Sequence, residues 1–158
     1  MSSGDSARAG PLAWHRGLAG LQAGTVGVLV LLGYLMADAV WRRQSVWRVP
    51  NLLAAALSDD ARVRASFSAR TVSGVALAIV IYGTLGALVA VATPQRLSRG
   101  SALLIGLLAA AAWLAFSSAF LWGQALGSSG RALWVAHLLY GGILSLRLPG
   151  GFGGGRLP

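Results

Sequence analysis

The stretch TVSGVALAIVIYGTLGALVAVATPQ (residues 71–95) decides the fold, because its 25 residues lie between Arg70 and Arg96 without a charged side chain. A helix that crosses the hydrocarbon core of a bilayer needs about 20 consecutive apolar residues. The stretch therefore predicts a transmembrane helix over about residues 71–93. The composition agrees, since 56% of the residues are hydrophobic and 11% are charged, against about 25% charged residues in a typical soluble domain.

The other intervals between arginines follow the same pattern and predict three more membrane-spanning helices. Their expected bounds are about residues 19–41, 101–123 and 130–147. The last is the shortest, because Arg131 and Arg147 enclose only 15 residues. A helix of this length still crosses if both guanidinium groups extend to the two interfaces; a re-entrant or interfacial helix is the alternative. The predicted fold is all-α, a polytopic membrane protein with four transmembrane helices.

We expect residues 18–147 to form the transmembrane domain, between a flexible N-terminal tail over residues 1–17 and a Gly-rich tail over residues 148–158. Four spans place both termini on the same side of the membrane. The connection between residues 41 and 70 is dense in arginine, as cytoplasmic loops are, so both termini are expected outside. The net charge of +9 is attributed to contacts with anionic lipid headgroups rather than with nucleic acid.

The connection contains the segment SVWRVPNLLAAALSDD (residues 45–60). Pro50 disfavours a helical conformation at Val49, and Asn51 is a strong N-cap residue. We therefore predict a short interfacial helix over residues 51–58, well below the length of a span. In the structural interpretation, this helix covers the bundle on one side. Its functional interpretation is a dock for lipid headgroups or a partner, and the expected contact residues are Arg42, Arg43, Trp47, Arg48 and Asn51.

Two segments, VWRVPNLLAAAL (residues 46–57) and WVAHLLYGGIL (residues 134–144), resemble a loose class of small four-helix bacterial inner-membrane proteins of unknown function. The likeness covers most of the chain in layout. It implies a multi-pass bundle in the inner (cytoplasmic) membrane of a bacterium. The class has no known activity, so the resemblance implies no catalytic residue.

Small residues recur at helical spacing in three of the predicted spans. Small side chains allow helix backbones to approach closely in a membrane, and GxxxG is the best known form of this pattern. The segment from Gly20 to Gly24 is such a motif. The stripes predict tight packing of helices, within the chain or against a partner, through Gly20, Gly24, Gly27, Gly83, Ala87, Gly106 and Ala110.

Few polar side chains lie inside the predicted spans, and the notable ones are Tyr34, Asp38, Tyr82, His137 and Tyr140. An intramembrane acid is a functional-site hypothesis by default. The structural alternative for Asp38 is an ion pair with Arg42 four residues later. For His137 the structural alternative is a hydrogen bond to Tyr82, Tyr34 or Ser117, and the functional one is a ligand of a haem or chlorin metal.

These residues do not assemble a catalytic set or a metal cluster, and the chain has no Cys. We expect a protein that is not an enzyme, an accessory subunit of a larger membrane complex such as a respiratory or photosynthetic one. No cofactor is predicted for the chain by itself, although His137 could hold a chlorin or haem shared with a partner chain. The alternative is a small oligomeric transporter or channel, in which Gln22, Tyr34, Asp38 and His137 would line a hydrated cavity.

Overall fold

The computed structural model describes residues 5–55, 66–94, 97–120 and 130–148, and within these ranges all regular structure is helical. The helices are α1 (Asp5–Trp41), α2 (Arg48–Ala54), α3 (Ala69–Ala92), α4 (Arg99–Phe120) and α5 (Gly130–Ser145). Three segments are long and apolar enough to cross a membrane: Trp14–Trp41, Ala69–Ala92 and Arg99–Ser118. The prediction of an all-α fold is confirmed, and the described residues contain three of the four predicted spans as helices long and apolar enough to cross a membrane.

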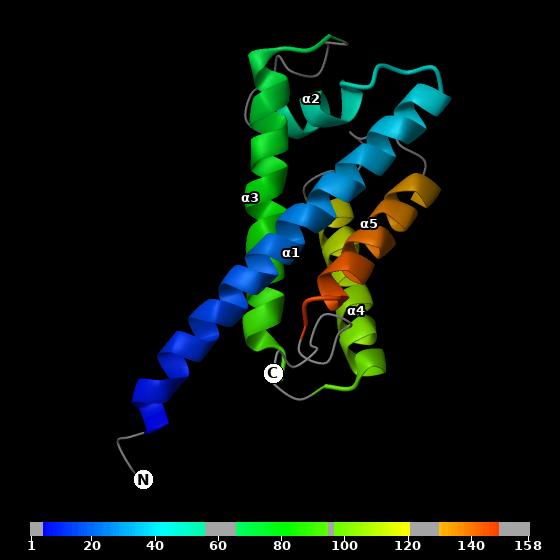
Figure 1. Cartoon of the computed structure of the whole chain (residues 1–158). Helices are drawn as coiled ribbons and strands as arrows, with labels where there is room; N and C mark the ends of the chain where they lie inside the picture. The colour runs from blue at the N-terminus through cyan, green and yellow to red at the C-terminus, as the bar shows by residue number, and fades with distance from the viewer. Residues whose placement is uncertain (1–4, 56–65, 95–96, 121–129, 149–158) are drawn as a thin grey trace.

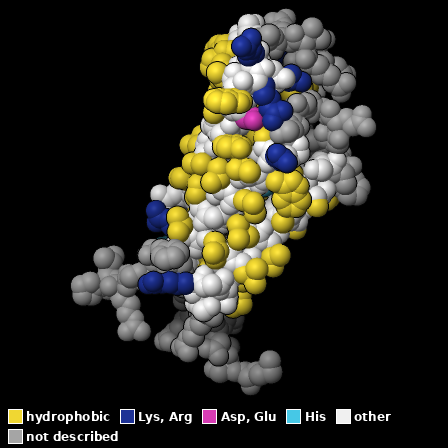
Figure 2. All heavy atoms as spheres, turned by 90° about the vertical axis from the view of Figure 1, so that its right-hand side faces the viewer, with side chains coloured by type: hydrophobic (Ala, Val, Ile, Leu, Met, Phe, Trp, Pro, Cys, Tyr) yellow, Lys and Arg dark blue, Asp and Glu magenta, His cyan; other side chains and the backbone are white. Residues whose placement is uncertain are grey.

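The helix α1 lies between two parts of the bundle (Figure 1), with α3 packed on one side and α5 on the other. The helix α4 packs against α5, and the short α2 packs against α3 near one end of the bundle. Hydrophobic side chains cover the middle of the face drawn in Figure 2, with basic side chains toward its two ends. This distribution is the one expected when arginines flank the hydrocarbon core.

The contact between α1 and α3 is made by backbone against backbone. A Cβ on Gly20 would collide with the carbonyl oxygen of Gly86, and a Cβ on Gly24 would lie 2.5 Å from the carbonyl oxygen of Tyr82. On α3, a Cβ on Gly86 would collide with the carbonyl oxygen of Gly20 and lie 2.9 Å from the Cα of Gly24, whereas one on Gly83 would first meet the end of the Leu21 side chain, at 3.0 Å. Glycine is therefore required on both helices for this approach, since any side chain would hold the two axes apart.

The pair α4 and α5 is joined in the same way. A Cβ on Gly106 would lie 2.5 Å from the carbonyl oxygen of Gly141, and one on Gly141 would lie 2.9 Å from the Cβ of Ala110. Gly27 makes room for the aromatic ring of Tyr140, which would stand 2.7 Å from a Cβ there. Of the predicted packing residues, Ala87 is the one that is only half-buried.

The helix α1 begins earlier than expected, because residues 5–17 are helical although we predict a flexible tail there. Several strong helix formers, such as Ala7, Arg8 and Leu12, extend the helix through this segment despite Pro11. Residues 1–4 and 149–158, which belong to the two predicted tails, lie outside the described residues.

The short helix α2 begins at Arg48 rather than at Asn51, so the prediction of Asn51 as the N-cap is wrong. Trp47 occupies that position without a side-chain capping bond. The reason is that Pro50 falls in the first helical turn, where its missing N–H has no intrahelical partner to lose. The predicted residues 56–58 lie outside the described part of the chain.

We expect Gly20→Ala to lower the free energy of unfolding by about 1–3 kcal/mol, the usual cost of forcing extra volume into a packed contact. Its methyl group would strike the Gly86 backbone and the Cβ of Ala90. The measurement is unfolding of the purified protein in mixed detergent micelles, followed by circular dichroism. The matched control is Gly33→Ala, because no atom of another described helix lies within 4 Å of that Cβ position. Equal stability of the two variants would contradict the packing described here.

Candidate functional site

A chain of hydrogen bonds links α3 and α5 inside the bundle. The hydroxyl of Tyr82 lies 2.8 Å from Nε2 of His137, and Nδ1 of His137 lies 2.8 Å from the carbonyl oxygen of Leu133. A carbonyl oxygen only accepts hydrogen bonds, so Nδ1 carries the proton and Nε2 accepts from the Tyr82 hydroxyl. The hydroxyl of Tyr140 donates to the Tyr82 carbonyl oxygen at 2.7 Å. The structure therefore shows the hydrogen bond between His137 and Tyr82, one of the alternatives that the sequence left open.

The ring of Tyr82 is at the centre of an aromatic cluster. It meets Tyr140 edge-on with ring centroids 5.0 Å apart and Trp113 with centroids 6.0 Å apart. Tilted and edge-to-face rings at these separations are favourable. Trp113 belongs to α4, so the cluster connects α3 to both α4 and α5.

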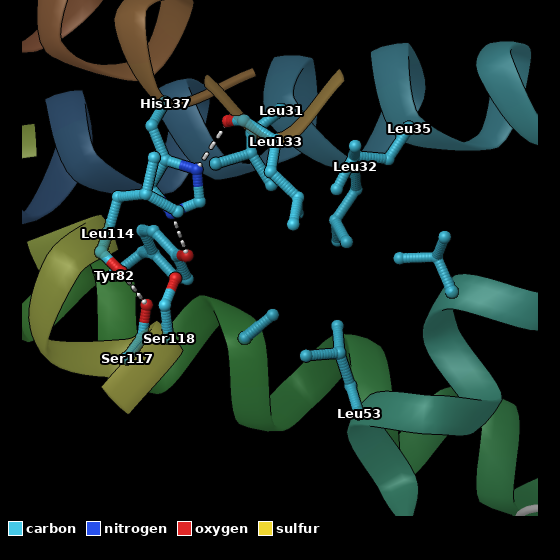
Figure 3. A pocket seen from close by; sticks show the side chains of 12 residues that line it. Leu31, Leu32, Leu35, Leu53, Tyr82, Leu114, Ser117, Ser118, Leu133 and His137 are labelled. Carbon is cyan, nitrogen blue, oxygen red and sulfur yellow. Dashed lines mark hydrogen bonds between the residues drawn. The ribbon is translucent and has the colours of Figure 1, made fainter. Parts of the chain in front are cut away.

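A cavity of about 80 Å³ lies next to this network (Figure 3). Its polar wall is formed by Tyr82, Ser117, Ser118 and His137. Its apolar wall is formed by Leu31, Leu32, Leu35, Val49, Leu53, Ala78, Leu114 and Leu133. None of these lining residues is charged. One water molecule needs roughly 10–15 Å³ of such space, so the cavity has room for several waters or for the end of a small molecule.

The structure brings together only some of the predicted polar residues. Tyr82, His137 and Tyr140 form one network, whereas Tyr34 packs at the edge of the hydrophobic core. Asp38 forms an ion pair with Arg42, with 2.9 Å between Oδ2 and Nε. The structural alternative for Asp38 is therefore observed, and Asp38 does not line the cavity.

Two residues of α4 next to this network, Trp113 and Ser118, were missed as site candidates. Ser117 was considered as a partner of His137, but its hydroxyl donates to the carbonyl oxygen of Leu114 at 3.1 Å. Adjacent hydroxyls in an otherwise apolar span are the signal that could have drawn attention to Ser118. Their position across from Tyr82 depends on the register of α3 and α4, which periodicity does not give.

The predicted headgroup contacts lie at the turn between α1 and α2. Arg43 is exposed and has a positive φ of 59°, and Trp47 meets Phe67 edge-on at 5.0 Å. Asn51 is different, because it is 3% exposed. Its amide nitrogen donates to the Ser66 carbonyl oxygen at 3.1 Å, and its oxygen accepts from the Thr71 hydroxyl at 2.6 Å. Asn51 thus fastens α2 to the start of α3 instead of facing headgroups.

Arg16, which lies just before the predicted span over residues 19–41, has a structural role. Its guanidinium group donates to the carbonyl oxygen of Ala90 at 2.7 Å and to that of Thr93. The last carbonyl groups of a helix have no intrahelical donors, and a cation there also interacts favourably with the helix dipole. Arg16 therefore ties α1 to the C-terminal end of α3.

No known protein family, curated protein or solved structure matched the chain when it was compared with them. The described residues also contain no group of three or more His, Asp or Glu side chains that could hold a metal ion. Both ring nitrogens of His137 already have hydrogen-bond partners. A haem or chlorin metal could bind His137 only after one of these bonds is broken.

We expect Tyr82→Phe to lower the free energy of unfolding by about 0.5–2 kcal/mol, because Nε2 of His137 loses its donor in a dry interior. The variant keeps the ring and so its aromatic contacts. The measurement is a double-mutant cycle with His137→Leu in detergent unfolding, and the two changes should be non-additive. Tyr34→Phe is the control, since the described structure shows no hydrogen bond to that hydroxyl. Additive effects of the two changes would contradict the link between Tyr82 and His137.

Proposed function

We propose that the chain is a non-catalytic integral membrane protein that serves as an accessory subunit of a larger membrane complex. The observation that carries the proposal is Gly33, on the outward face of α1. It is exposed, and apart from the backbone of its own helix no atom of the described residues lies within 4 Å of the place where its Cβ would be. At Gly20 and Gly24 on the same helix, by contrast, the backbone of α3 occupies the space that a Cβ would need.

A glycine inside a helix is about 1 kcal/mol less favourable than alanine. Gly20 and Gly24 offset this cost by allowing a close helix contact, whereas Gly33 makes no such contact within the chain. Ala37 follows four residues later and is also exposed, so the two form a small-xxx-small pair on one face. Val30 lies on the same face. These features support a partner helix packing on α1 at this position.

The polar groups considered for chemistry support a structural role. Both nitrogens of His137 and the carboxylate of Asp38 are engaged within the chain. Asn51 is likewise occupied between α2 and α3. These contacts hold three helices and the turn after α1 together, and this supports a structural role for the groups.

We further propose that α5 is the fourth span and that the host is a bacterial inner membrane, with both termini outside. The 16 residues of α5 make a helix of about 24 Å at 1.5 Å per residue, slightly shorter than a hydrocarbon core of about 30 Å. Trp134 is 50% exposed and Leu138 is 44% exposed, which suits a lipid-facing surface. Arg131 and Arg147 are exposed at its two ends, where they can reach anionic headgroups.

The cavity is the observation that favours the alternative, a small oligomeric transporter or channel. His137 lines it, as that hypothesis expects. Tyr34 and Asp38 do not line it, and Gln22 is exposed on α1. Three of the four residues proposed for a hydrated path therefore lie elsewhere, and the subunit proposal has the stronger support.

The test is purification in a mild detergent from the native membrane, with a photoreactive amino acid at Val30 to capture whatever touches this face of α1. We expect a larger assembly and a crosslink to a different membrane protein. The Gly33→Leu variant should lose the larger assembly and the crosslink, because the leucine side chain occupies the docking position. The isolated variant should be as stable as the wild type. Gly142→Leu on α5 is the matched control, since its Cβ position is also free of neighbours within 4 Å. A crosslink to a second copy of the chain, or retention of the partner by Gly33→Leu, would overturn the proposal.

A further inference from the structure

The helices α3 and α4 leave an open seam between them. The main helix contacts of the described bundle join α1 to α3 and α5, and α4 to α5, whereas α3 and α4 have little direct backbone contact. The pair Tyr82 and Trp113 bridges the seam through their rings. The cavity lies on one side of this bridge, and an apolar groove lined by residues such as Val89, Ile105 and Leu108 lies on the other.

The polar wall of the cavity has a definite set of free hydrogen-bonding positions. Both nitrogens of His137 are used, the Tyr82 hydroxyl donates to His137, and the Ser117 hydroxyl donates to Leu114. The oxygens of Tyr82 and Ser117 retain lone pairs that can accept. The hydroxyl of Ser118 has no hydrogen bond within the described structure. Figure 3 shows these three hydroxyls on the same side of the cavity as the His137 ring.

This pattern selects the chemistry of a ligand. The wall offers one free donor, Ser118, and free acceptors on Tyr82 and Ser117, and none of the lining residues is charged. A carboxylate or phosphate would lose its hydration without gaining a cation, which is strongly unfavourable. A ketone or ester carbonyl would satisfy the donor but none of the acceptors. A hydroxyl group satisfies both, because it donates and accepts at the same time.

We infer that the cavity binds the head of an uncharged long-chain alcohol taken from the bilayer. The hydroxyl would accept from Ser118 and donate to the oxygen of Tyr82 or Ser117, and the first methylene groups would contact the leucines of the opposite wall. Ser118 lines the cavity and is also exposed. The hydrocarbon chain of the alcohol can therefore leave the cavity beside it. The volume of about 80 Å³ has room for a hydroxyl group and the first methylene groups.

The test uses the purified full chain in phosphatidylcholine vesicles and a photoreactive hexadecanol analogue, with its methyl ether as the comparison. We expect saturable labelling at residues 114–118 by the alcohol and about fivefold weaker labelling by the ether, which cannot donate and so loses one hydrogen bond of about 1 kcal/mol. Ser118→Ala should weaken binding of the alcohol about fivefold, which corresponds to one hydrogen bond of about 1 kcal/mol. Ser73→Ala, which removes an exposed hydroxyl of α3, should bind like the wild type.

Equal saturation by alcohol and ether would overturn the inference, because the site would then recognise only the hydrocarbon chain. Unchanged binding by Ser118→Ala would overturn it as well. The comparison of alcohol with ether is made on the wild-type protein and so does not depend on the folding of any variant. The measurement also needs no partner chain. Its failure would therefore leave the subunit proposal intact, and loss of the partner contact would leave this site intact.

Discussion

The structure depends on the close approach of α1 to α3, in which glycine on each helix faces the backbone of the other. Gly20 and Gly24 meet the segment of α3 from Tyr82 to Gly86 without any side chain between them. In a bilayer there is no hydrophobic force between helices, so van der Waals packing of this kind has to hold the bundle together. With α1 fixed against α3, its other side receives α5, and α4 reaches the bundle through the pair of Gly106 and Gly141. The guanidinium group of Arg16 fastens the same contact at the end of α3.

The second constraint is the cost of polar groups in a dry interior. Three of the polar side chains that α3 and α5 carry are joined to one another: the hydroxyl of Tyr82 bonds to the ring of His137, and that of Tyr140 bonds to the carbonyl oxygen of Tyr82. This arrangement fixes the rotation of α5 relative to α3, and it gives the cavity its one polar wall. Gly83 and Gly86 of α3 face α1, and Gly106 of α4 faces α5, so these glycines bring neither helix close to the other. The bundle thus combines tight glycine contacts along α1 with a cavity that α1 lines through Leu31, Leu32 and Leu35.

The sequence was sufficient for the features that depend on local composition. Intervals between arginines predicted the three long spans, and the spacing of Gly20 and Gly24 indicated a packing face. It could not supply the partner of each glycine, because Gly86 and Gly141 are chosen by the register of helices distant in the chain. The role of Asn51 was misjudged for a similar reason: a capping propensity is local, whereas its bonds to Ser66 and Thr71 form only once α2 lies on α3. The cavity is lined by residues of five helices, so no single sequence motif could predict it.

The most direct test is a disulfide crosslink between α1 and α3 in native membranes, which is simple because the chain has no Cys of its own. The pair Thr25→Cys and Gly83→Cys is suitable, since a Cβ on Gly83 would lie 3.4 Å from the Thr25 hydroxyl oxygen. The control pair joins Thr25→Cys to Leu104→Cys on the outward face of α4, where Leu104 is 57% exposed. The account predicts rapid formation of an intramolecular disulfide in the first pair and none in the second. Failure of the first pair to crosslink under oxidising conditions, or equal crosslinking of both, would contradict the central position of α1 against α3.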